Sequence, residues 1–157
     1  MHPIQMFAQT AERNYRIIKM QTEGLTDEDS LIQPPFQGNC LNWVLGHIIY
    51  HRGRILKLLG ASSDWPEELV LRYKRESEPV LGSAEDVLSL TQLLSLLDQS
   101  QGRIMAALQN ISTEALEAVV NKRTIQEQLA GLQWHETYHM GQLELLRQLS
   151  GKNDKVI

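Results

Sequence analysis

The stretch NWVLGHIIYHRGRILKLLG, residues 42–60, decides the fold class of this chain. Its apolar side chains recur at intervals of three and four residues, which is the spacing that places them along one face of an α-helix. Asn39 or Asn42 can cap the start of this helix, and Gly60 can end it. The same periodicity continues through most of the chain, and no segment alternates convincingly with a period of two. The sequence therefore predicts an all-α protein.

Helix breakers and capping residues divide the chain into four long helices. Pro34, Pro35 and Gly38 exclude a continuous helix between the first and the second. Ser83 is expected to open the third helix, and Thr124 with Glu127 forms a capping box that opens the fourth. The predicted helices cover about residues 4–21, 42–60, 84–109 and 124–151.

The connection between the second and third helices, residues 61–82, is long. The 157 residues suit a single domain with one core, and no internal repeat or low-complexity tract divides them. An antiparallel four-helix bundle with one long loop, spanning residues 1–157, is the most economical architecture.

Composition restricts the class of partner and the cellular compartment. A net charge of -4 argues weakly against nucleic acid or an anionic membrane as partner. No apolar run approaches the roughly 20 residues that span a bilayer. Cys40 is the single cysteine, which excludes an intrachain disulfide framework, and the N-terminal segment lacks the pattern of a signal peptide. We therefore expect a cytoplasmic protein with no nucleic-acid or membrane partner.

Four of the five histidines form two pairs with a spacing of four residues. His47 and His51 lie in HIIYH of the second predicted helix, and His135 and His139 lie in HETYH of the fourth. Two imidazoles one helical turn apart project from the same face and can bind one metal ion. The presence of two such pairs in one small bundle predicts a metal site, whereas a single pair would be weak evidence.

HETYH also fits the H-E-x-x-H motif of zinc proteases. Those enzymes take a third ligand downstream, but no histidine follows His139 here. Glu144 lies five residues past His139 and is turned away from the histidine face. The third ligand must therefore come from the second helix, and we do not expect a protease.

Two segments carry a resemblance to a known family: NWVLGHIIYHRGRILKLLG and LAGLQWHETYHMGQLELLRQLSG. The chain resembles the DinB/YfiT-like family of metal-binding four-helix bundles over nearly its whole length. The resemblance implies His47, His135 and His139 as the metal ligands. It also implies a right-handed or otherwise unusual up-down-down-up connectivity and a homodimer.

The resemblance implies more than one function. Characterised members of the family include thiol transferases that couple thiols such as bacillithiol to electrophiles, a mycothiol-dependent isomerase and domains of thiol-histidine biosynthesis. We therefore expect a divalent metal ion (zinc, nickel or iron) and a metal-dependent enzyme, either a thiol transferase with a small-molecule thiol and an electrophile as substrates or a hydrolase-like enzyme. The alternative is a non-catalytic bundle whose metal serves structure or sensing.

Several residues near the ligands have candidate roles. Glu136 is the candidate catalytic base, with a solvated surface charge as the alternative, and Gln142 can orient an imidazole or contact a ligand. His51 would close the site if it were a fourth ligand. Cys40 is interpreted as structural. Aromatic and basic residues that can line a pocket, or else belong to the core or the surface, are Trp43, Tyr50, Trp134, Tyr138, Arg52 and Arg54.

Overall fold

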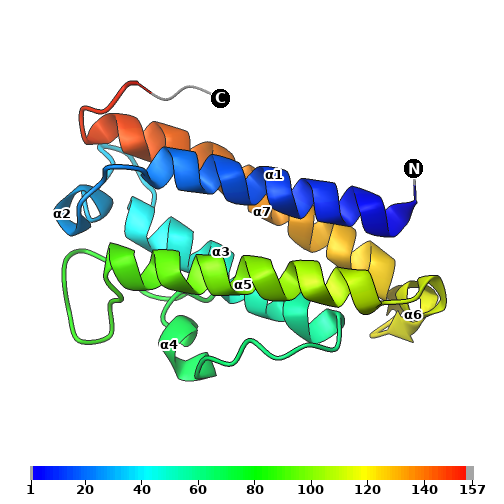
Figure 1. The fold of residues 1–157 in the computed structure, drawn as a ribbon. Helices are drawn as coiled ribbons and strands as arrows, with labels where there is room; N and C mark the ends of the chain where they lie inside the picture. The colour runs from blue at the N-terminus through cyan, green and yellow to red at the C-terminus, as the bar shows by residue number, and fades with distance from the viewer. Residues whose placement is uncertain (1, 155–157) are drawn as a thin grey trace.

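Four long helices carry the fold of the computed structural model, which describes residues 2–154 (Figure 1). This confirms the prediction of an all-α four-helix bundle. The long helices are α1 (Pro3–Thr22), α3 (Leu41–Leu58), α5 (Leu90–Asn110) and α7 (Ile125–Leu149). The short elements between them are α2 (Asp27–Ser30), α4 (Glu67–Leu71), α6 (Thr113–Glu117) and the strands β1 (Val119–Val120) and β2 (Arg123–Thr124).

The long helices are connected in an up-down-down-up order. Both α1 and α3 pack against α5 and α7, so α1 and α3 lie on one diagonal of the bundle. Figure 1 shows that α1 and α7 run in one direction and α3 and α5 in the other. The predicted long loop is confirmed: it returns the chain to the end of the bundle where α3 began, so that α5 runs parallel to α3. A bundle in which every helix is antiparallel to the one before it is therefore not formed.

Two predicted helix N-caps were wrong. Neither Asn39 nor Asn42 caps α3; Cys40 is its N-cap residue without a side-chain bond, and the Asn42 amide donates to the Leu88 carbonyl instead. The third long helix begins at Leu90 and not near residue 84, because Ser89 and not Ser83 forms the capping box.

Other helix boundaries follow the predicted signals. The Thr124–Glu127 capping box is present at the start of α7. Gly60 follows the end of α3 with φ +73°, and the amides of Gly60 and Ala61 donate to the carbonyls of Lys57 and Leu56. This is the Schellman arrangement, which a glycine accommodates without strain.

The core draws large apolar side chains from all four long helices, but it also contains charged groups. Arg52, Glu136 and Arg147 are at most 3% exposed.

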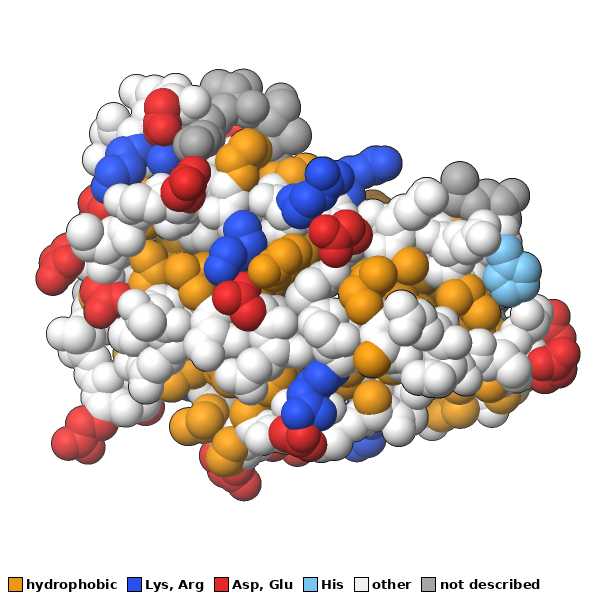
Figure 2. Space-filling view, viewed as in Figure 1, with side chains coloured by type: hydrophobic (Ala, Val, Ile, Leu, Met, Phe, Trp, Pro, Cys, Tyr) orange, Lys and Arg blue, Asp and Glu red, His pale blue; other side chains and the backbone are white. Residues whose placement is uncertain are grey.

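On the face shown in Figure 2, acidic and basic side chains are interspersed, and hydrophobic side chains appear in small areas between them. None of the helices in residues 2–154 combines the length and the apolar content that a membrane span requires.

Candidate metal centre

His47 on α3 and His135 and His139 on α7 meet inside the bundle. The Nε2 atom of His135 lies 3.3 Å from Nε2 of His47 and 3.1 Å from Nε2 of His139. One ligand atom from each of the three rings lies within 4.8 Å of the other two. The structure therefore brings together the three histidines that the family resemblance implied as ligands.

Two of the three rings are held by hydrogen bonds at their far nitrogen. His47 Nδ1 lies 2.7 Å from the Tyr73 carbonyl oxygen, and His139 Nδ1 lies 2.7 Å from Gln142 Oε1. Both partner atoms can only accept, so each Nδ1 carries the proton and donates. Each neutral ring then presents an unprotonated Nε2 to the cluster, as a metal ligand must. Gln142 thus has the orienting position expected for it.

Gly46 allows the contact between Tyr73 and His47. Tyr73 follows α4 in the long connection, and its ring lies directly against the α3 backbone: a Cβ atom on Gly46 would be 2.2 Å from Cδ1 of Tyr73. The Tyr73 hydroxyl also donates to Asn42 Oδ1 and accepts from the Leu88 amide. The connection is therefore fixed on α3, and this places the Tyr73 carbonyl beside His47.

The three rings are held neutral by their surroundings. Burial lowers the pKa of His47, of His139 and of His135, the last to about 4, and neighbouring histidines lower those of His47 and His135 further. In addition, His135 Nδ1 is buried and has no hydrogen-bond partner. A group of three neutral imidazoles, one buried and two half-buried, does not bind protons readily, and it leaves its lone pairs for another cation.

The spacing of the nitrogens fits a metal ion. Nε2 of His135 faces two acceptor nitrogens, and a single proton on it can satisfy only one of them. In a tetrahedral zinc site with Zn–N bonds of about 2.0–2.1 Å, ligand nitrogens lie about 3.3–3.4 Å apart. Two of the three spacings, 3.1 and 3.3 Å, are close to this edge length, and all three ligand atoms lie within 4.8 Å of one another. The donor set and its geometry therefore suit one divalent ion.

His51 is adjacent to the cluster but is not part of the three-histidine group. Its ring centroid lies 4.1 Å from that of His135 and 4.6 Å from that of His47. Its Nδ1 faces a guanidinium nitrogen of Arg54 at 3.5 Å, while its Nε2 is buried without a partner. Burial first, then the neighbouring histidines and Arg54, lowers its pKa to about 2.

The aromatic residues predicted to line a pocket separate into two groups. Trp43 is buried and stacks on His47 with ring centroids 4.6 Å apart, and Tyr50 lies 5.2 Å from His51. Trp134 and Tyr138 stack on each other at the surface, 70% and 56% exposed. Trp43 and Tyr50 therefore border the cluster from α3, and Tyr138 meets the His139 ring edge-on with centroids 5.2 Å apart.

An open cavity of about 1050 Å³ reaches the cluster, and His51 and His135 are part of its wall. One side of the wall comes from α3 and the long connection, and the other from the β1–β2 hairpin and the start of α7. Its charged side chains are exposed and of both signs: Arg54, Lys57, Glu67, Arg123 and Glu127. A small molecule entering this cavity can reach the edge of the histidine cluster.

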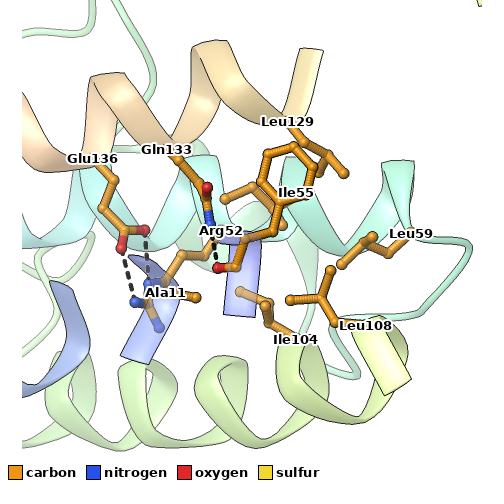
Figure 3. A pocket seen from close by; sticks show the side chains of 10 residues that line it. Ala11, Arg52, Ile55, Leu59, Ile104, Leu108, Leu129, Gln133 and Glu136 are labelled. Carbon is orange, nitrogen blue, oxygen red and sulfur yellow. Dashed lines mark hydrogen bonds and ion pairs between the residues drawn. The ribbon is translucent and has the colours of Figure 1, made fainter. Parts of the chain in front are cut away.

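Glu136, between the two histidines of α7, is turned to the other side of the helix. Its two carboxylate oxygens each accept a hydrogen bond of 2.9 Å from Arg52 (Figure 3). The alternative of a solvated Glu136 and the surface position considered for Arg52 were wrong, because the two are 3% and 0% exposed, and both carboxylate oxygens of the candidate base Glu136 are bound by Arg52. The sequence spacing does indicate that Glu136 is buried, because it shares one helical face with the buried residues Leu129, Met140 and Leu143.

The fold and the site together define a four-helix bundle with a three-histidine cluster on its second and fourth long helices. Comparison with known families finds the DinB superfamily over residues 10–143, and the chain belongs to that superfamily. Its structure is similar to that of a conserved protein from Enterococcus faecalis, with a TM-score of 0.75 and 21% identity over 97% of this chain and 99% of that one. At this identity the similarity shows the fold alone. No curated protein matches the chain.

Proposed function

We propose that the protein binds one divalent metal ion through the Nε2 atoms of His47, His135 and His139. The observation that carries the proposal is the convergence of these nitrogens, two of them made acceptors by hydrogen bonds at Nδ1. Imidazole ligands suit zinc, nickel and iron, and availability selects among them.

A site with three neutral ligands supports a catalytic function better than a structural one. A structural zinc site is closed by four protein ligands. His51, the nearest candidate for a fourth, has its Nδ1 facing Arg54 and lies outside the three-histidine group. When bound, a divalent ion with an open coordination position lowers the pKa of a thiol or water that occupies it.

The proposed reaction class is transfer of a low-molecular-weight thiol to an electrophile. The large cavity at His135 supports this class, because it has room for two small reactants and offers both apolar and charged contacts. The chain's own residues would bind and orient the reactants there: Trp65 and Leu132 can pack against apolar groups, and Arg54 can pair with a carboxylate. A non-catalytic bundle with a structural or sensing metal is the second candidate, and it is favoured if His51 joins the ligand set.

The test is cobalt substitution followed by addition of a thiol. We expect metal-free protein to take up one equivalent of Co²⁺ and to develop a thiolate charge-transfer band in the near ultraviolet when cysteine or 2-mercaptoethanol is added. His139→Ala protein is the control and should show neither signal. A cobalt site that forms but does not respond to either thiol would contradict the transferase proposal and leave the non-catalytic one.

We propose three further properties. The resemblance to the family implies a homodimer, and the exposed Trp134 and Tyr138 would supply part of an apolar contact. Sedimentation analysis of the wild-type protein and of a Trp134→Ser variant tests this. We also propose a single domain over residues 1–157 and a cytoplasmic location, which fractionation of the producing cells would check.

A further inference from the structure

We propose that the ion pair between Arg52 and Glu136 is a positioning element that holds α3 and α7 in the register required by the metal centre. This inference rests on the proposed metal site. It assigns a role to two buried charges that are neither ligands nor part of the wall of the large cavity at His135, and that line a separate small pocket (Figure 3).

The pair joins the two helices that carry the ligands. Arg52 follows His47 by five residues on α3, and Glu136 lies between His135 and His139 on α7. Each helix rises about 1.5 Å per residue. A shift of one helix along the other by a single residue would therefore displace His47 by about 1.5 Å relative to the other two rings. The ion pair is thus close enough to the ligands to control their relative position.

The geometry of the pair is directional. Arg52 donates through Nε and Nη2 to the two oxygens of Glu136, each bond 2.9 Å long, and through a third nitrogen to Ser100 and Gln101 of α5. The side chains are 0% and 4% exposed. A two-pronged contact between a planar guanidinium and a planar carboxylate fixes both the rotation and the axial offset of the helices.

Stability alone does not account for such a pair. Charges removed from water lose hydration, and apolar residues of similar volume often replace a buried ion pair without loss of stability. Apolar side chains around the pair, including Ile55, Ile104 and Leu129, would pack against such a replacement (Figure 3), although Ser100 and Gln101 would lose the Arg52 donor. What an apolar pair lacks is the directional contact that sets the register of the ligands.

The experiment separates positioning from stability with the double variant Arg52→Met/Glu136→Leu. We expect a thermal midpoint that falls moderately, because Ser100 and Gln101 lose a hydrogen-bond donor. Zinc affinity should be lower by about 10- to 100-fold, as is usual when residues that orient metal ligands are changed, and the d–d bands of the cobalt-substituted site should change. Glu136→Gln, which keeps the shape of the side chain, should also weaken zinc binding if the double variant does not fold.

Arg147→Met is the matched control. Arg147 is another buried arginine of α7, 2% exposed, but it bonds to the carbonyls of Gln21 and Glu23, away from the ligands. We expect this variant to lower the thermal midpoint and to keep the zinc affinity within about twofold. Wild-type affinity and cobalt spectrum in both Arg52–Glu136 variants, or an equal loss of affinity in Arg147→Met, would overturn the positioning role while leaving the metal site intact. Absence of zinc binding by the wild type would overturn both.

Discussion

The imidazole of His47 donates a hydrogen bond to the backbone carbonyl of Tyr73 across 2.7 Å. This bond attaches the long segment between α3 and α5 to the metal centre. It fixes which nitrogen of His47 carries the proton, and it leaves Nε2 for the cluster. The bond exists because the Tyr73 ring lies against Gly46, where no side chain intervenes. The long connection therefore has a role in the site, although it supplies none of the three ligands.

The first prediction concerns Gly46→Ala. The new methyl group would overlap the Tyr73 ring, which is 0% exposed and hydrogen-bonded at its hydroxyl, so the connection has to move away from α3. We expect a loss of about 1–3 kcal/mol of unfolding free energy, typical of overpacking, and weaker zinc binding. Urea denaturation and calorimetric titration measure the two effects.

Gly53→Ala is the control on the same helix. A Cβ atom there would meet only Trp65, at 4.0 Å, and alanine is a better helix former than glycine by about 1 kcal/mol. Unchanged or increased stability is expected. Equal effects of the two substitutions would show that the Tyr73 contact is not the cause.

The second prediction concerns Gln142→Leu, which removes the acceptor of the His139 Nδ1 proton. Without it the ring loses its fixed orientation, and zinc affinity should fall by about 10-fold or more. Gln148→Leu, an exposed position on the same helix, should bind zinc like the wild type. If Gln142→Leu binds zinc with wild-type affinity, the hydrogen bond does not orient the ligand.

The third prediction is a pH dependence of the metal-free protein. An unfolded histidine has a pKa of about 6.5, whereas in the folded protein the pKa of His135 is about 4 and that of His51 about 2, mainly through burial. Between these values the unfolded chain binds more protons than the folded one. The contribution of these two histidines to the free energy of unfolding should therefore be independent of pH above about pH 7. As the pH falls from about 6.5 toward 4, the free energy of unfolding should decrease.

Urea denaturation at several pH values between about 7.5 and 4.5 measures this dependence. The double variant His51→Gln/His135→Gln should show a shallower decrease, because glutamine does not titrate in this range. A wild type whose stability rises on acidification, or a variant with an unchanged slope, would contradict the assignment of these histidines as buried and neutral.

Much of the fold was predictable because its signals are local. The Thr124–Glu127 capping box and the glycine after α3 act within one helical turn, so a single segment reveals them. Two ligands were also accessible, since His135 and His139 lie four residues apart and share a helix face, and a further ligand had to come from the second long helix. That this ligand is His47 and not His51 was implied only by the family resemblance. Bundle connectivity was implied only by the family resemblance, because periodicity does not encode the direction of packing.

The features that the sequence did not reveal depend on contacts across the bundle. Ser83 and Ser89 are both acceptable N-caps. In the structure the adjacent Leu88 accepts a hydrogen bond from Asn42 and donates one to the Tyr73 hydroxyl, and these contacts accompany the choice of Ser89. Arg52 and Glu136 looked like surface charges, because pairing between helices is needed to bury them. The spacing of Glu136 within an apolar stripe was the one local indication.

The most direct test of the account is the metal content of single histidine variants after zinc loading and removal of free metal. Elemental analysis should find one zinc per chain in the wild type and in His51→Ala, and little or none in His47→Ala, His135→Ala and His139→Ala, with circular dichroism confirming that each variant keeps its helices. Loss of zinc from His51→Ala as complete as that from His47→Ala would contradict a three-ligand site. Full zinc content in His47→Ala or His135→Ala would show that the metal, if bound, lies elsewhere.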